Sequence, residues 1–101
     1  YFFLLTEAMV DAGVEQGLPR EVALTLATGT ALGAGAMLTA GGDGPGQLRY
    51  NVCSPGGTTA AAIREFEAGG LRATVADAME AAASRSREMA VAATENDDEM
   101  N

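Results

Sequence analysis

The chain has 101 residues and a net charge of −8, with one cysteine and no histidine. This length fits a single domain around one core. The basic residues are six scattered arginines, which do not form the basic stripe that nucleic-acid binding requires. Without histidine the chain has no histidine base or zinc ligand, so we expect no metal. The lone Cys53 forms no internal disulfide and suits a reducing cytoplasm.

The first sixteen residues predict a helix that is apolar over more than half of its surface. Glu7, Asp11 and Glu15 recur every four positions, which places them on one stripe. Because the remaining positions are mostly apolar, we expect this helix to be buried on most sides. Gly17 supplies its C-terminal stop.

A second helix is expected to begin with Pro19 at its first position, and it carries no charge from Val22 to Ala40. Its length enters the range of a membrane-crossing helix. Its threonines and glycines, and the lack of aromatic or basic anchors at its ends, favour a buried helix in a soluble oligomer. Gly29 and Gly33, four residues apart, leave one face nearly flat for a neighbouring helix.

The rest of the chain also reads as helices joined by glycine-rich breaks. Residues 41–46 predict a loop, residues 47–52 a short helical turn, and Gly69-Gly70 the end of the next helix. A last helix runs from about Leu71 into the nineties, followed by an acidic tail at 95–101 that we expect to be disordered. No segment shows a period of two. We therefore predict an all-α fold of about four main helices plus a short one, with no sheet.

The composition leaves little side-chain volume for a core. The helices are rich in alanine, glycine and threonine, and the aromatic content is only 5%. Helices from a second copy would supply the missing contacts. We therefore predict an obligate homodimer with interleaved helices.

The most distinctive stretch is Val52-Cys53-Ser54-Pro55-Gly56-Gly57-Thr58-Thr59. Ser54 suits the N-cap of a helix and Pro55 its first position. Three amides would then lack intrahelical partners, and the positive end of the helix dipole favours an anion such as a carboxylate or phosphate. These amides belong to Gly56, Gly57 and Thr58. An ordinary capped helix start is the alternative interpretation of the same residues.

This stretch and the residues around it also resemble the signature of a known protein family. The residues of the signature are Pro45, Leu48, Val52, the run 53–59, Ala62, Ile63, Phe66 and Glu67. Supporting segments are 1–5, 7–8, 11–14, 17–20, 69–72 and 81–88. Over about residues 1–92 the chain resembles the C-terminal, dimerising domain of pyrroline-5-carboxylate reductase.

The resemblance implies an enzyme of proline biosynthesis, in which NADPH or NADH gives hydride to the imine of 1-pyrroline-5-carboxylate and yields L-proline. In this family an N-terminal dinucleotide-binding domain holds the cofactor, while the helical domain makes the homodimer and commonly a ring of five dimers, a decamer. Residues 1–94 would be the dimerisation and substrate-binding domain, and the dinucleotide-binding domain is absent from this chain. We therefore expect half an active site, no cofactor bound here, and no activity from these residues alone.

The resemblance also implies roles for individual residues. Ser54, Gly57 and Thr58 resemble the cradle for the substrate carboxylate, and Thr59 resembles the catalytic hydroxyl beside the ring nitrogen. The whole substrate-binding set is Val52, Cys53, Ser54, Gly56, Gly57, Thr58 and Thr59. Many relatives have an acidic residue before the segment matching Pro45-Gly46, where this chain has only Asp43 nearby.

Two other classes of protein remain open from the sequence. One is a purely structural helical module whose only activity is self-association. The other is a small membrane protein, which rests on residues 22–40 and which solubility without detergent would exclude. The preferred interpretation has a second copy and a small carboxylate as partners, with no nucleic acid and no membrane.

Overall fold

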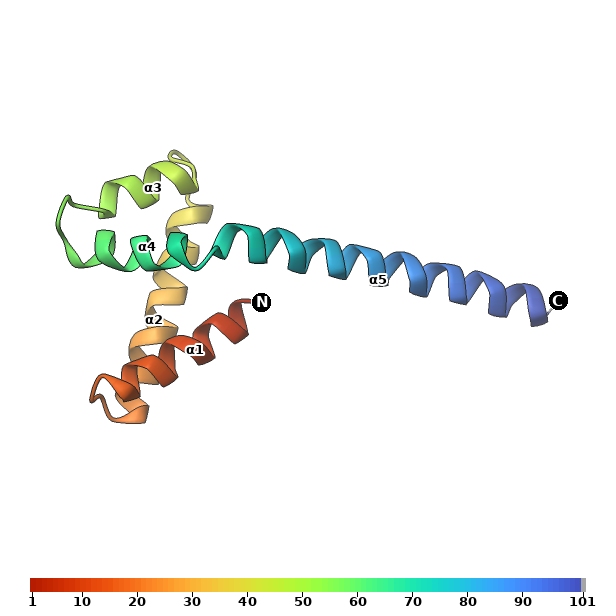
Figure 1. The fold of residues 1–101 in the computed structure, drawn as a ribbon, viewed down its shortest axis with the longest axis horizontal. Helices are drawn as coiled ribbons and strands as arrows, with labels where there is room; N and C mark the ends of the chain where they lie inside the picture. Colours follow the sequence, from red (N-terminus) through yellow and green to blue (C-terminus); the bar gives the residue numbers. More distant parts are fainter. Residues whose placement is uncertain (101) are drawn as a thin grey trace. The chain divides into compact units, whose positions relative to one another are not determined.

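The computed structural model describes residues 1–100, which form five helices and contain no strand (Figure 1). The helices are α1 (Phe2–Glu15), α2 (Arg20–Thr39), α3 (Pro45–Val52), α4 (Thr58–Ala68) and α5 (Leu71–Met100). The all-α prediction is confirmed for this part of the chain. The short helical turn predicted at 47–52 is longer, because α3 already starts at Pro45, where a fixed φ suits a first helical residue. Pro19, in contrast, is the N-cap of α2 and not its first residue.

The chain divides into two compact units, Tyr1–Val52 and a second that begins at Cys53. In the first unit α1 packs against α2. The core at this contact consists of Val10, Ala23 and Ala27, with Val14 packed partly buried against it. These small side chains bury little apolar surface.

Gly13 of α1 lies close to Ala23 of α2. A Cβ added there would lie 3.1 Å from the Cβ of Ala23. We expect Gly13→Leu to destabilise the chain by about 1–3 kcal/mol, because overpacking outweighs the better helix propensity of leucine. Urea unfolding at a fixed protein concentration measures the change. Gly46→Leu, where no atom lies within 4 Å of the added Cβ, is the control and should cost much less.

The first unit leaves most of its apolar surface exposed. We expected α1 to be buried on most sides, but Val10 is its only fully buried residue, and Ala23 and Ala27 are the only ones in α2. By length and composition α2 could cross a membrane. Its mean hydropathy in the most apolar window is 1.5. The prediction of a buried second helix therefore does not hold within a single chain. One helix can cover only one side of its neighbour, so the other apolar faces of both helices stay open.

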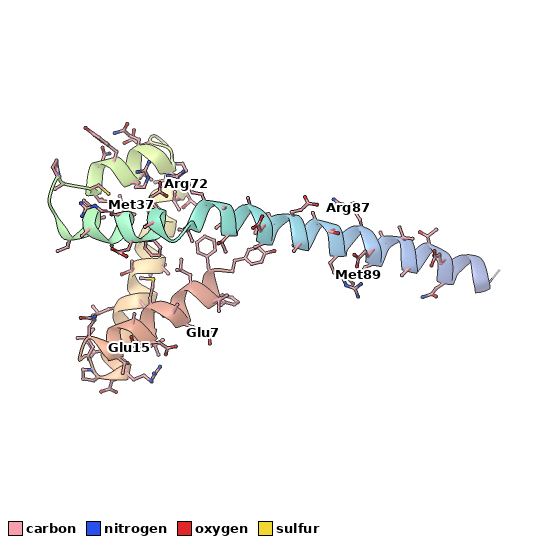
Figure 2. The ribbon with its side chains drawn as sticks, in the orientation of Figure 1. Glu7, Glu15, Met37, Arg72, Arg87 and Met89 are labelled. Atoms are coloured by element: carbon pink, nitrogen blue, oxygen red, sulfur yellow. The ribbon has the colours of Figure 1, made fainter. Side chains whose placement is uncertain are left out.

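In the second unit α4 packs against α5, which follows after the Gly69-Gly70 break. Arg72 of α5 donates to Glu67 of α4 at 2.8 Å, an exposed pair that contributes little to stability. The apolar side chains of α5 are also exposed, including Met89 at 57% (Figure 2).

Helix α5 continues further than the sequence suggested. The acidic residues from Glu95 onward were expected to form a disordered tail, but the helix runs through them to Met100. Ala90, Ala92 and Ala93 carry high helix propensity into this end, and no glycine or proline follows to stop the helix. Asn101, the last residue of the predicted tail, lies outside the described residues.

Candidate functional site: the start of helix α4

The predicted binding stretch forms a tight turn followed by a helix. The amide of Gly57 donates to the carbonyl oxygen of Ser54 at 2.9 Å, which closes a four-residue turn. Pro55 is the second residue of this turn, and Gly56 is the third with φ +73°. Proline followed by a residue with positive φ is the pattern of a type II turn. Gly56 is needed here for its backbone conformation, which an L side chain would strain.

The helix therefore starts later than we predicted. Gly57 is the N-cap of α4, with φ −82° and ψ 174°, and Thr58 is its first helical residue. Ser54 is not the cap and Pro55 is not in the first turn, because the positive φ of Gly56 interrupts any helix between them. The amide of Gly57 is also not free for a ligand, since Ser54 accepts its hydrogen bond.

The amides at the open end of α4 are those of Thr58, Thr59 and Ala60. The first helical hydrogen bond of α4 runs from the amide of Ala61 to the carbonyl of Gly57, at 3.2 Å. The preceding amides have no carbonyl four residues back within the helix. No side chain caps this helix start. Ala60 was missed by the sequence analysis, because its contribution comes from the backbone and depends on where the helix begins.

The hydroxyls of Thr58 and Thr59 are also available. Most other threonines in the described helices donate back to the carbonyl four residues earlier, at 2.7–3.0 Å. These are Thr6, Thr25, Thr28, Thr30, Thr39 and Thr94. Thr58 and Thr59 stand in the first turn, where the residues four back belong to the turn and not to a helix. Thr59 is half-buried and Thr58 exposed.

The other predicted residues are distributed over both units. Val52 is the last residue of α3 in the first unit, whereas Cys53 opens the second unit as a half-buried free thiol. Ser54 is exposed, and its carbonyl oxygen accepts the hydrogen bond that closes the turn. Asp43 accepts a hydrogen bond from the amide group of Asn51 at 3.4 Å, within the first unit.

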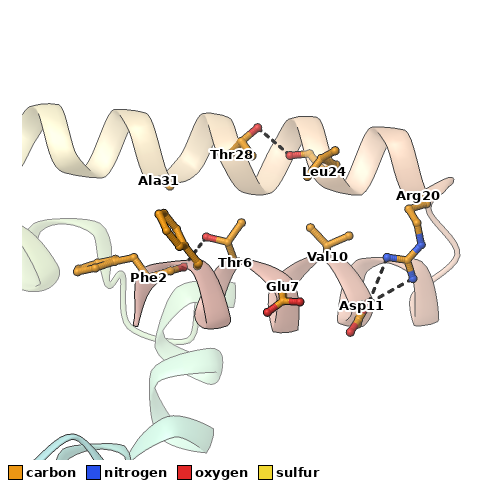
Figure 3. A pocket seen from close by; sticks show the side chains of 10 residues that line it. Phe2, Thr6, Glu7, Val10, Asp11, Arg20, Leu24, Thr28 and Ala31 are labelled. Atoms are coloured by element: carbon orange, nitrogen blue, oxygen red, sulfur yellow. Dashed lines mark hydrogen bonds and ion pairs between the residues drawn. The ribbon is translucent and has the colours of Figure 1, made fainter. Parts of the chain in front are cut away.

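The two cavities described for this chain both lie in the first unit. The larger cavity, about 490 Å³, lies between α1 and α2 (Figure 3). The smaller one, about 130 Å³, is also lined by residues of α1, α2 and their connection. None of residues 53–59 lines either cavity. Hydrogen-bond donors are thus assembled at the open N-terminus of α4.

Thin packing, exposed apolar helices and an open helix N-terminus define a self-associating helical domain with donors for an anion. Comparison with known proteins identifies the family. The chain belongs to the pyrroline-5-carboxylate reductase dimerisation family, whose model matches residues 1–89. The predicted resemblance is confirmed.

Individual relatives agree with this assignment. Pyrroline-5-carboxylate reductase of Pisum sativum is 54% identical over 89 residues, which are 88% of this chain and 33% of that protein. The Pseudomonas aeruginosa enzyme is 51% identical over 90 residues, 89% of this chain and 33% of that protein. The chain thus spans about a third of the length of the curated relatives it matches.

Two solved structures share the fold. The pyrroline carboxylate reductase of Plasmodium falciparum, solved with NADP bound, has a TM-score of 0.83 and 37% identity. The match covers 86% of this chain and 34% of that one. The 1-pyrroline-5-carboxylate reductase of Streptococcus pyogenes has a TM-score of 0.76 and 40% identity, with 79% and 31% covered.

Proposed function

We propose that this chain is the dimerisation and substrate-binding part of an NAD(P)H-dependent reductase that converts 1-pyrroline-5-carboxylate to L-proline. The observation that carries the proposal is the open start of α4, where the free amides of Thr58, Thr59 and Ala60 lie beside two threonine hydroxyls without internal partners. Family membership and the names of the relatives support the reaction class.

The carboxylate of the substrate binds at this helix end. Backbone amides there point out of the helix, and the helix dipole adds a partial positive charge. Hydrogen bonds from amides to a carboxylate are charge-assisted and therefore stronger than hydrogen bonds between neutral groups. The turn at Pro55-Gly56 holds the chain so that a ligand can approach the amides without meeting a side chain at either glycine.

The Thr59 hydroxyl orients the reacting end of the substrate. It lies one residue into α4, and it can donate to the ring nitrogen while the amides hold the carboxylate. When NAD(P)H is bound it supplies the hydride, which adds to the imine carbon as the π pair moves to nitrogen. A fixed donor beside that nitrogen stabilises the lone pair that forms. Thr59 is not the acid of the reaction, because its hydroxyl pKa is far from a matched value, and the proton comes from solvent.

The working enzyme is an obligate homodimer, assembled further into a pentamer of dimers in the cytoplasm. The exposed apolar faces of α1 and α2 support the dimer, since a chain with so small a core gains most of its buried surface from association. NADPH or NADH is held mainly by protein outside these residues. Neither nucleic acid nor membrane takes part.

A chimera tests the proposed function. We would replace the matching segment of the Pisum sativum relative by residues 1–89 of this chain and follow NAD(P)H oxidation with 1-pyrroline-5-carboxylate. We expect turnover within about tenfold of the parent enzyme, because the site donors are the backbone and hydroxyls of one loop. The matched control carries Thr58→Ala and Thr59→Ala together and should lose most of that activity.

The same chimera distinguishes a substrate-binding domain from a purely structural module. If the chimera forms the parental dimer but its turnover does not depend on Thr58 and Thr59, the domain only assembles the protein and the proposed substrate site is wrong.

A further inference from the structure

We propose that the side chain of Ile63 in α4 contacts the ring of the bound substrate and restricts that ring to five members. This inference rests on the proposed function and adds a residue that sets the ring size accepted at the same site. Ile63 is not a hydrogen-bond donor, so its part in the site follows from its place on the helix and not from its residue type.

The first turns of α4 have one half-buried face. Of the eleven residues of this helix, only Thr59, Ala60 and Ile63 are half-buried, and the rest are exposed. Residues three or four positions apart lie on the same side of a helix. Thr59 and Ala60 carry free amides at the helix start. Ile63 therefore shares the face of α4 that carries these donors.

The side chain of Ile63 projects toward the helix start. Side chains of an α-helix lean toward its N-terminus, and those at i and i+4 lie one above the other. Ile63 lies four residues after Thr59, which is about 6 Å along the helix axis. Its β-branch restricts it to few rotamers. Phe66, the other large apolar residue of α4, lies almost a turn further along and is 43% exposed. Ile63 is thus the bulky apolar side chain of α4 nearest to the free amides.

The substrate presents an apolar edge in the matching direction. Its carboxylate binds the amides at the end of the helix, and its ring nitrogen accepts from the Thr59 hydroxyl on the side of the helix. The ring therefore passes from the helix end onto the face of Thr59. Its methylene carbons, which lie away from both polar groups, then extend toward the next side chain on that face, which is Ile63.

This contact discriminates by ring size. A six-membered homologue of the substrate carries one more methylene group on the edge that faces Ile63. Because the carboxylate and the nitrogen are both held, the ring cannot move away to make room. One additional methylene in an apolar site changes kcat/KM by about 10- to 200-fold.

Substitution of Ile63 in the chimeric reductase tests the inference. We would measure kcat/KM for 1-pyrroline-5-carboxylate and for its six-membered homologue, 1-piperideine-6-carboxylate. Ile63→Ala opens the face beside Thr59, so the ratio of the six-membered to the five-membered value should rise about tenfold or more. Ile63→Val removes a single methyl group and keeps the β-branch, so it should fold normally and raise the ratio about two- to fourfold.

Leu71→Ala is the matched control. Leu71 is an aliphatic residue of the same unit, 44% exposed, at the first position of α5. Its truncation removes similar bulk away from the start of α4, so the ratio should equal that of the parent. Inhibition by the products gives a second readout. The inhibition constant of L-pipecolate relative to that of L-proline should fall about tenfold in Ile63→Ala and stay unchanged in Leu71→Ala.

The outcomes are distinguishable. A purely structural role of Ile63 would lower kcat/KM for both substrates by the same factor. An unchanged ratio in folded Ile63→Val and Ile63→Ala, or an equal change in Leu71→Ala, would overturn the ring-size inference and leave the proposed function intact. If Ile63→Ala does not fold, the Ile63→Val ratio decides alone. Turnover that does not depend on Thr58 and Thr59 would overturn the proposed function, and the inference with it.

Discussion

We expect Thr59→Ala to lower kcat of the chimeric reductase by on the order of tens- to a thousand-fold, because one oriented transition-state donor is lost. Thr59 is half-buried and its hydroxyl has no internal hydrogen bond, so the substitution removes no hydrogen bond of the fold. Thr59→Ser keeps the hydroxyl and should recover most of the activity. Steady-state kinetics with 1-pyrroline-5-carboxylate measures both.

Thr74→Ala is the matched control for this experiment. Thr74 lies in the same unit, on the exposed first turn of α5. Its replacement by alanine also removes a threonine hydroxyl, but not one at the start of α4. We expect its kinetics to equal those of the parent. Equal kcat for Thr59→Ala and Thr74→Ala would remove Thr59 from the mechanism.

We expect Gly57→Val to raise KM and the inhibition constant of L-proline about ten- to a hundredfold, which corresponds to the loss of one or two hydrogen bonds to a charged group. A Cβ at Gly57 would lie 3.1 Å from the carbonyl oxygen of Ser54. That oxygen must shift, which disturbs the turn, and the added methyl groups stand beside the amides that we propose as the carboxylate site.

Gly69→Val controls for the general cost of a crowded glycine. Gly69 closes the other end of α4, and a Cβ there would lie 3.3 Å from the carbonyl oxygen of Glu65. Both variants should lose similar stability in urea unfolding, but only Gly57→Val should weaken proline binding. If both variants weaken binding equally, the effect comes from the helix as a whole and the assignment of the carboxylate site to its start fails.

The positions of the helices were largely predictable because glycines mark the breaks between them. Gly17 and Gly69-Gly70 separate the helices where we expected, whereas the loop predicted at 41–46 is shorter because α3 begins at Pro45. The end of α5 was not predictable in the same way. Its acidic composition suggested disorder, while the alanines before Thr94 continue the helix.

Residue types in the sequence indicated the candidate site, but they did not predict its backbone geometry. Ser54-Pro55 can start a helix or open a turn, and only the backbone of Gly56 decides between them. Because Gly56 forms part of a turn, the free amides are those of Thr58–Ala60 and not those predicted at Gly56–Thr58. The expected burial of α1 and α2 depends on a second copy, and no pattern within one sequence specifies where that copy packs.

One substitution pair tests the central claim that free backbone amides at the start of α4 hold the substrate carboxylate. Thr58→Pro removes both the amide hydrogen and the hydroxyl at the first helical position, where proline is tolerated. Thr58→Ala removes the hydroxyl alone. The inhibition constant of L-proline, measured for both variants of the chimeric reductase, isolates the amide. We predict that proline binds about ten- to a hundredfold more weakly to the Thr58→Pro variant than to the Thr58→Ala variant. Equal inhibition constants in two folded variants would contradict the claim.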